Sequence, residues 1–326
     1  MGDYVKQHTM FDLVQDELGL VEKKLAAVIE SEDDILTEMG VHLLRAGGKR
    51  LRPALYFLCA KARCMEEHGS IPIAAAIELI HMATLVHDDV LDNASTRRSH
   101  PTANARWGNH ASVLAGDYLF AKAFSLVAGD GNKTALSILT NEICAICEGE
   151  IAQIRDNFNI NQDEKDYLVR IRKKTAGFIA ASCELGAIAA GLSNAEIKSL
   201  YNYGLAVGMA FQITDDIFDV TASAEQIGKP VGNDLKQGIL TLPVIYALTH
   251  GSRRDELVKL IAGRDMSEDK HSQCMDIVLG TDAVEYSYQK VAEYLAIAKA
   301  NLPKLIGDDV GAVLLTVADF IGLRKY

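Results

Sequence analysis

The chain has 326 residues, of which 49% are hydrophobic and 24% charged, a composition typical of a globular protein with a large buried core. Its formal net charge of −11 excludes a general electrostatic attraction to nucleic acid or to an anionic membrane surface. An acidic protein that binds phosphates therefore needs local basic residues or a divalent cation. With only 6 prolines and many windows rich in Ala, Leu, Ile, Glu and Lys, the sequence predicts an all-α fold.

The N-terminal segment MGDYVKQHTM has no basic stretch followed by an apolar one, and charged or polar residues interrupt the apolar stretches. We therefore expect a cytoplasmic protein without a signal peptide or transmembrane segment. The 6 cysteines show no disulfide-framework spacing. Cys144 and Cys147 form a C-x-x-C with no second pair to complete a zinc site, so we expect them on a buried helix face.

Hydrophobic periodicity predicts a first amphipathic helix over 11–30. The segment LRAGGKRLRP at 44–53 predicts a loop leading into a helix, because Gly47 and Gly48 disfavour a helix interior and Pro53 fits a first turn. Residues 72–92 are apolar nearly all round and predict a buried helix, followed by the loop NASTRRSHPT. Further helices are predicted at 111–127, 134–156, 163–190, 194–220, 241–249, 254–262, 284–300 and 309–322.

Strand-type alternation, hairpin turns, internal repeats and flexible linkers are not apparent in the sequence. We therefore expect residues 1–326 to form a single helical domain. The one repeated feature is the pattern Asp-Asp-x-x-Asp, which occurs at 88–92 and again at 215–219.

Each clump places its first and last aspartates on one helix face, whereas Asp89 and Asp216 lie about 100° around the helix, where they could support the metal-binding residues or act as alternate ligands. One such clump also fits an exposed helix end. Both, however, follow long apolar segments, where uncompensated charges are costly. Because Mg²⁺ binds through one or two carboxylates and substrate phosphates, the pair predicts a magnesium-dependent diphosphate site. The predicted ligands are Asp88, Asp89, Asp92, Asp215, Asp216 and Asp219.

Basic residues stand beside glycines or beside the aspartate clumps, and are Lys49, Arg50, Arg52, Arg97, Arg98, Lys174 and Lys229. Arginine offers forked donors to phosphate, and lysine acts as a point charge. A metal-rich side and a basic side suggest two diphosphates bound together. The sequence therefore predicts the joining of two apolar diphosphate esters by electrostatic stabilisation of a leaving diphosphate, without a nucleophile triad.

Seven segments, in order, resemble the signature blocks of trans-isoprenyl diphosphate synthases: GGKRLRP, HDDVLDNASTRR, PTANARWGN, LAGDYLFAKAF, KT, FQITDDIFD and GKPVGNDL. The resemblance runs from about residue 40 to residue 245 and more weakly to the end. It implies an isoprenoid synthase fold, a bundle of long helices around a central apolar cavity. It also implies a homodimer and magnesium bound by the two aspartate motifs on the allylic diphosphate.

The resemblance further implies roles for single residues. Those expected at the allylic diphosphate or the reacting carbons are Asp88, Asp89, Asp92, Arg97, Lys174, Thr175, Gln212, Asp215 and Lys229. Those expected to bind substrate, mainly isopentenyl diphosphate, are Lys49, Arg52, His81, Arg98 and Phe211. His81 alone would also fit a satisfied core histidine.

Two positions depart from the family pattern. Ser99 stands where glycine is more common, and Ile239 replaces the lysine usual after Gly238. The second change, with CEGEIAQIRD and the C-terminal FIGLRKY, resembles the larger subunit of bacterial heptaprenyl diphosphate synthases. That resemblance implies quinone side-chain biosynthesis and a small regulatory partner subunit, and leaves open whether this chain needs one.

In short-chain members of the family, aromatic residues four and five positions before the first aspartate block the cavity. Here these positions are Thr84 and Ala83, and Ile80 and Ala76 continue the wall one and two turns of about 5.4 Å further on. Residues near 143–151 are expected at the floor. The resemblance therefore implies a product of about six to eight isoprene units, heptaprenyl before hexaprenyl or octaprenyl.

Two rival hypotheses fit less well. A terpene cyclase normally lacks a second aspartate motif of this kind and the isopentenyl-side cations Lys49, Arg52 and Arg98. A non-catalytic partner subunit would be free to lose its aspartates, and all of them are present.

Overall fold

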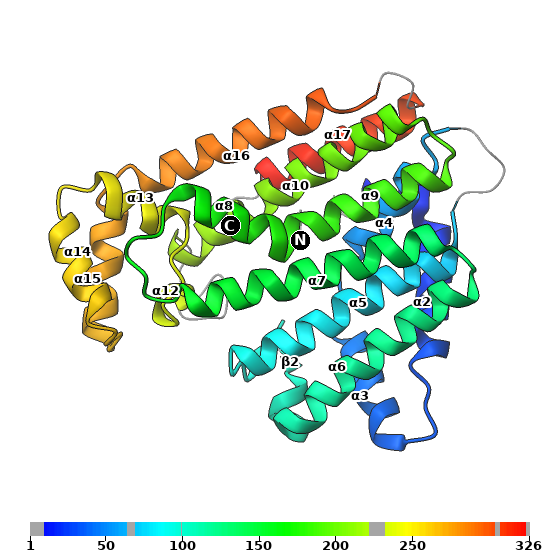
Figure 1. Ribbon diagram of the computed structural model, residues 1–326, viewed down its shortest axis with the longest axis horizontal. Helices are drawn as coiled ribbons and strands as arrows, with labels where there is room; N and C mark the ends of the chain where they lie inside the picture. Colours follow the sequence, from blue (N-terminus) through cyan, green and yellow to red (C-terminus); the bar gives the residue numbers. More distant parts are fainter. Residues whose placement is uncertain (1–9, 64–68, 99, 222–231, 304–306, 324–326) are drawn as a thin grey trace. The chain divides into compact units, whose positions relative to one another are not determined.

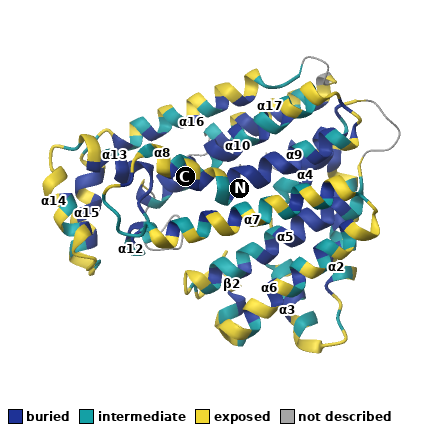
Figure 2. Ribbon diagram, in the orientation of Figure 1, coloured by how far each residue is buried: buried dark blue, intermediate teal, exposed yellow. Residues whose placement is uncertain are grey.

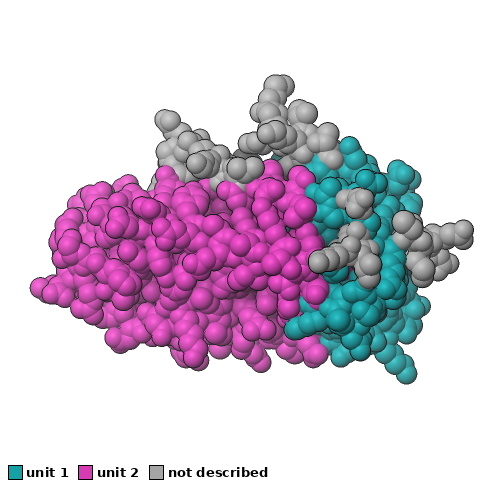
Figure 3. Space-filling model, turned by 90° about the horizontal axis from the view of Figure 1, so that it is seen from above, with its two compact units in different colours: residues 1–140, 182–198, 303–314 teal, residues 141–181, 199–302, 315–326 magenta. Residues whose placement is uncertain are grey.

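The computed structural model describes all residues except 1–9, 64–68, 99, 222–231, 304–306 and 324–326 (Figure 1). Within this part the chain is helical apart from one two-stranded sheet, which confirms the all-α prediction. The chain forms two compact units (Figure 3). Unit 1 holds residues 1–140, 182–198 and 303–314, and unit 2 holds 141–181, 199–302 and 315–326. The single domain and its central cavity stay predictions.

Unit 1 is built on one long core helix. Its elements are η1 (Asp12–Val14), α2 (Gln15–Val28), α3 (Asp34–Arg45), α4 (Leu51–Ala60), α5 (Ile71–Leu91), β1 (Thr96–Arg97), β2 (His100–Pro101) and α6 (Ala103–Gly129), after which α7 (Lys133–Arg155) begins. Helix α5 starts where the Ser70 hydroxyl accepts from the Ile73 amide and Pro72 fits the first turn. It packs against α2, α4 and α6, and most of its side chains are buried (Figure 2). The prediction of a buried helix over 72–92 is confirmed.

Two helices of unit 1, α5 and α6, are long and apolar enough to cross a membrane by length and composition alone. The expectation that polar residues interrupt every apolar stretch was therefore too strict. In α5, 61% of the apolar window is buried, as in the core helix of a folded unit. In α6 only 33% of the window is buried.

The segment after α5 was predicted to be a plain loop, and that prediction is wrong in one detail. Thr96 pairs with Pro101 and Arg97 with His100 in a short antiparallel ladder. The Thr102 hydroxyl donates to the carbonyl of Ala94 over 2.7 Å and closes the hairpin. The pairing turns the chain back towards the end of α5.

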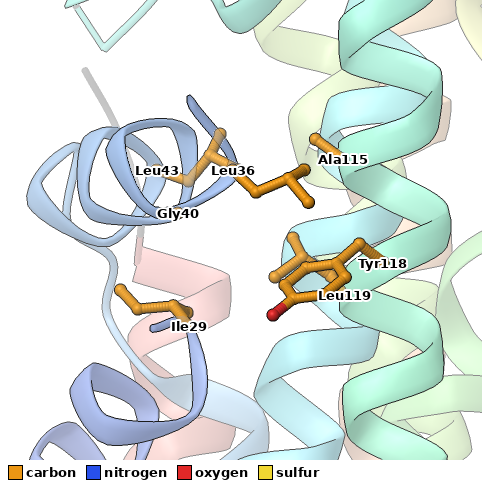
Figure 4. A pocket seen from close by; sticks show the side chains of 7 residues that line it. All are labelled: Ile29, Leu36, Gly40, Leu43, Ala115, Tyr118 and Leu119. Atoms are coloured by element: carbon orange, nitrogen blue, oxygen red, sulfur yellow. The ribbon is translucent and has the colours of Figure 1, made fainter. Parts of the chain in front are cut away.

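Helix α3 was not predicted, because glycine at position 40 weakens the helical pattern. The glycine permits a close approach, since a Cβ there would lie 2.9 Å from the Cβ of Ile29. Beside it lies an apolar pocket lined by Ile29, Leu36, Gly40, Leu43, Ala115, Tyr118 and Leu119 (Figure 4). Figure 4 shows side chains of α3 and α6 meeting there, so the pocket belongs to the packing of these two helices.

Unit 2 contains the rest of α7, then α8 (Glu164–Ile171), the π-helical turn η2 (Arg172–Ala176), α9 (Gly177–Ala189), α10 (Asn194–Thr221), α12 (Asn233–Lys236), α13 (Leu242–His250), α14 (Arg254–Ala262), α15 (Glu268–Leu279), α16 (Ala283–Ala300) and α17 (Asp308–Leu323). Parts of α9, α10 and α17 belong to unit 1. The predicted helix over 163–190 is interrupted by η2, where the Gly177 amide donates to the Arg172 carbonyl five residues back. Its Ala176 packs on Gly208, where a Cβ would lie 2.6 Å from the Ala176 Cα.

The expectation for Cys144 and Cys147 is wrong, because both are exposed. The buried side of α7 is instead a stripe that includes Leu139, Ile146 and Gln153. Apolar residues surround the two cysteines in the sequence but lie on other faces of the helix.

Candidate active site

The first aspartate motif ends α5 in unit 1. Asp89 is buried, and its Oδ1 accepts from Arg97 Nε over 2.8 Å. The hairpin after α5 returns Arg97 to this position. Asp88 is half-buried and Asp92 exposed, four residues apart on one face. The structure thus separates an aspartate that binds arginine from two that share a face, as the helical spacing predicts.

Positive side chains from two distant segments gather around His81. Burial first, and then the charges of Arg52, Arg98, Arg97 and Arg50, hold the pKa of His81 well below its usual value. An Arg98 Nη1–H donates to the carbonyl of Gly47, which joins the segment after α5 to the glycine loop before α4. The structure therefore brings together the Arg52, His81 and Arg98 that sequence reasoning assigned to one substrate.

Arg50 belongs to this cluster but serves another purpose. Its Nε donates to Glu22 Oε1 over 2.5 Å and its Nη1 to Glu78 Oε1 over 2.8 Å. Glu78 is almost fully buried on α5, so the ion pair with Arg50 offsets the cost of burying its carboxylate. Burial lowers the pKa of neighbouring Arg52 to about 10, against the opposing charge of Glu78. Sequence reasoning missed Glu22 and Glu78, because their partner lies 28 residues away.

The His81 environment predicts a pH-dependent stability. In the unfolded chain a histidine titrates near pH 6.5. In the folded chain the pKa of His81 lies well below that value, so His81 stays neutral at a pH where the unfolded chain already takes up a proton. The stability contributed by neutral His81 is thus present above about pH 6.5 and is lost as the pH falls below it. We expect urea denaturation of the wild type to show a steeper loss of unfolding free energy from pH 6.5 to 5 than His81→Asn does. Equal slopes in the two proteins would contradict this reading; His250→Asn, on an exposed residue, is the control.

The second aspartate motif ends α10 in unit 2 and forms the centre of a hydrogen-bond chain. Asp216, 4% exposed, accepts from Tyr167 Oη over 2.7 Å and from Gln212 Nε2 over 2.8 Å. The Thr175 hydroxyl donates to Gln212 Oε1 over 2.7 Å. Thr175 lies on the π-helical turn η2, a geometry frequent at functional sites. Hydrogen bonds therefore link three predicted residues, Thr175, Gln212 and Asp216. The sequence did not predict Tyr167, because its surroundings on α8 are those of an ordinary core tyrosine.

Electrostatics around Asp216 are unusual. Burial, followed by the charge of Asp234, raises the pKa of Asp216 to about 8, although the hydrogen bonds from Tyr167 and Gln212 and the charge of Arg170 oppose the shift. A nearby cation would favour the charged carboxylate.

Asp219, the last aspartate of the motif, is held by the chain that follows it. Its Oδ1 accepts from the Asn233 amide over 3.0 Å and its Oδ2 from the Asp234 amide over 3.2 Å. Its carbonyl accepts from the Gly232 amide over 2.6 Å. Asp216 and Asp219 are thus both fixed by protein donors, while Asp215 is half-buried on the same helix.

The remaining predicted residues are Lys174, Lys229, Phe211, Lys49 and Ser99, and two of them lie outside the described part of the chain. Lys174, on η2, forms an ion pair with Glu150, and Lys229 lies outside the described residues. Phe211 is half-buried on α10, and Lys49 is exposed beside the glycine loop. Ser99 is also outside the described part of the chain.

The expected chain-length residues lie along α5. Ala76, Ile80 and Ala83 are fully buried. Thr84 is half-buried, and its hydroxyl donates to the His81 carbonyl over 2.8 Å. The expected floor extended as far as Ile151, whose side chain is 66% exposed, and the floor stays a prediction.

The donor sets fit magnesium. In the described part of the chain no group of three or more His, Cys, Asp or Glu side chains is close enough to hold a metal ion unaided. Mg²⁺ is commonly held by one or two carboxylates, with substrate phosphates and waters completing the octahedron. Asp88 and Asp92, four residues apart on α5, supply that kind of set.

Tyr167 offers a test of the hydrogen-bond chain. Tyr167→Phe removes one of the two donors to Asp216 without changing the shape of the buried ring. Partners of this kind typically contribute about 10- to 100-fold in metal affinity or activity. We expect a fall of that order in kcat, or an equal rise in the Mg²⁺ concentration for half-maximal rate. Tyr288→Phe, on a tyrosine outside this chain of hydrogen bonds, should leave both unchanged.

Comparison with known proteins supports the family that the sequence motifs resemble. Residues 33–278 match the protein family described as polyprenyl synthetase. The chain is 43% identical over 325 residues to heptaprenyl diphosphate synthase component 2 of Geobacillus stearothermophilus, covering 99% of this chain and 100% of that protein. It is 37% identical to octaprenyl diphosphate synthase of Escherichia coli (strain K12), covering 74% and 75% of the two chains.

Solved structures show the same fold. The polyprenyl synthase from Caulobacter crescentus CB15, complexed with calcium and isoprenyl diphosphate, superposes with a TM-score of 0.92 at 34% identity, covering 98% of each chain. The heptaprenyl diphosphate synthase from Staphylococcus aureus superposes with a TM-score of 0.90 at 32% identity, covering 96% of this chain and 99% of that one. The chain therefore belongs to the polyprenyl synthetase family and is a polyprenyl diphosphate synthase.

Proposed function

We propose that this chain elongates an allylic diphosphate such as farnesyl diphosphate with isopentenyl diphosphate, in the presence of Mg²⁺, to a medium-chain product, heptaprenyl diphosphate. The similarity to heptaprenyl and octaprenyl diphosphate synthases supports a medium-chain product. Thr84 and Ala83, small at the positions expected to limit chain length, support it independently.

The observation that carries the proposal is the arginine cluster around His81. Burial first, and then the charges of four guanidinium groups, hold the pKa of one imidazole well below its usual value in a chain whose net charge is −11. Carboxylates of the chain pair with Arg50 and Arg97, and the further positive charge of Arg52 and Arg98 favours an anionic substrate. Arginine forks match the oxygens of a diphosphate, and isopentenyl diphosphate is the anion proposed here, bound by Lys49, Arg52, His81 and Arg98.

Each group of residues then has a task. Mg²⁺, when bound, supplies charge neutralisation for the departing diphosphate. Asp88 and Asp92 bind the metal, and Asp89 aims Arg97 at the allylic diphosphate through its 2.8 Å hydrogen bond. Lys174 and Lys229 add positive charge to the same diphosphate, and Phe211 lines the substrate site. The Thr175 hydroxyl, fixed by Gln212, faces the developing carbocation.

The partners are part of the proposal. Val113 and Leu114 of α6 are exposed apolar side chains, and a second copy of the chain covers them, giving a homodimer. The name component 2, carried by a relative, supports a small second subunit in addition. We propose a cytoplasmic location and a product that supplies quinone side chains.

The test is an incubation of the purified chain alone with farnesyl diphosphate, labelled isopentenyl diphosphate and Mg²⁺, followed by sizing of the dephosphorylated products. Products that accumulate at about six to eight units would support a self-sufficient medium-chain enzyme. Elongation that begins only when a small second subunit is added would support the two-component form instead. Metal-independent turnover, or cyclic hydrocarbons formed from farnesyl diphosphate alone, would contradict the proposal.

A further inference from the structure

The turn that follows the second aspartate motif is itself held from behind by a histidine. His271, on α15, is 6% exposed, and its Nε2 lies 2.9 Å from the carbonyl oxygen of Gly232. A carbonyl oxygen can only accept, so the His271 Nε2 carries the hydrogen and donates it. His271 belongs neither to the aspartate motifs nor to the basic residues that the sequence predicts for the site.

Gly232 is the centre of this arrangement. Its φ of +67° is one that glycine adopts without strain, and it precedes the first residue of α12. A Cβ at this position would lie 2.5 Å from His271 Nε2 and 2.8 Å from Met275 Sδ. The ring and the thioether of α15 therefore pack directly on the backbone of the turn, and Figure 1 shows α12 and α15 within the same part of unit 2.

The same turn fixes the aspartates. The amide of Gly232 donates to the Asp219 carbonyl, and the next two amides donate to the two carboxylate oxygens of Asp219. Movement of Gly232 would thus alter the direction of the Asp219 carboxylate.

We propose that His271 is a positioning residue for the second magnesium-binding motif: it holds the turn at Gly232 whose backbone amides orient Asp219. This inference rests on the proposed function. A histidine that only satisfies a buried carbonyl would stabilise the fold without changing the metal requirement, and that difference can be measured.

The experiment compares His271→Leu and His271→Gln with the wild type and with His250→Leu, a control on an exposed histidine of the same unit. The first readout is hydrogen exchange of the amides of Gly232, Asn233 and Asp234 in the metal-free protein. The second is the Mg²⁺ concentration that gives half-maximal elongation, with the KM for isopentenyl diphosphate measured alongside.

For His271→Leu we expect exchange at these three amides to accelerate at least about tenfold and the Mg²⁺ requirement to rise about 10- to 100-fold, with the KM for isopentenyl diphosphate unchanged. His271→Gln, which keeps a donor, should recover most of both effects. Faster exchange with an unchanged Mg²⁺ requirement would overturn the proposal, as would unchanged exchange.

If circular dichroism shows that His271→Leu does not fold, Gly232→Ala provides the second test. The new methyl group disturbs the turn from the opposite side of the same contact. The proposal requires it to raise the Mg²⁺ requirement as well, and an unchanged requirement in a folded Gly232→Ala would overturn it. A wild type that elongates nothing would contradict the proposed function, whereas the exchange measurement needs no turnover and reports on the His271 contact separately.

Discussion

Asp88→Ala is expected to lower kcat/KM for elongation by on the order of 10²- to 10³-fold or more, while the fold is retained. Asp88 is half-buried at the end of α5, so alanine removes a carboxylate that we propose binds the metal, without opening a cavity in the core. Asp92 alone would then share the metal with substrate phosphate and water. Steady-state kinetics over a range of Mg²⁺ concentrations, with the thermal midpoint as a check on folding, measure the effect.

The matched control is Asp255→Ala on α14, where the aspartate side chain is 89% exposed and forms only a long ion pair with Arg254. It removes the same charge and should leave kcat/KM within about twofold, because surface ion pairs of this kind contribute little. Unchanged turnover in Asp88→Ala would remove the metal assignment of the first motif.

Thr84→Phe is expected to shorten the product to about three or four isoprene units, because an aromatic ring one turn of about 5.4 Å from Asp88 stops the growing chain close to the metal site. Thr84 is half-buried, whereas Ala83 is fully buried. A phenylalanine at Ala83 should also shorten the product, but at a cost of about 1–3 kcal/mol in folding free energy from overpacking. Chromatography of the dephosphorylated products measures chain length directly.

Thr84→Val is the control for this substitution. It removes the hydroxyl that donates to the His81 carbonyl and keeps the size of the side chain. Product length should therefore stay the same as in the wild type. If Thr84→Phe produced the wild-type range of products, Thr84 would not lie beside the path of the growing chain.

Helical periodicity predicted the long elements of the fold, and α5, α10 and α16 were predicted to within one or two residues. The misses have local causes. Glycine inside α3 and a mostly polar sequence in α15 weakened the apolar pattern, and the residues RKKTA of η2 are equally compatible with a continuous α-helix. Exposure of Cys144 was missed because apolar neighbours in sequence need not share a helix face.

The candidate site followed from the sequence wherever a residue belongs to a motif. The two aspartate clumps and the arginines near 50 and 97 could be recognised by spacing and charge. Tyr167, Glu78 and His271 could not, because each acts through a partner distant in sequence: Tyr167 on Asp216, Glu78 on Arg50 and His271 on Gly232. Such pairings arise from tertiary packing and leave no local pattern.

The π-helical turn η2 also sets how far α8 is rotated about its axis relative to α9. A π-turn holds one residue more than the α-helical turn that it replaces, and each residue of an α-helix turns the next by about 100°. Deleting one residue within 172–176 would let α8 and α9 join in a continuous α-helix. The face of α8 that carries Tyr167 would then rotate away from Asp216 by about that angle. We therefore expect residues 172–176 to tolerate a substitution better than a change in their number.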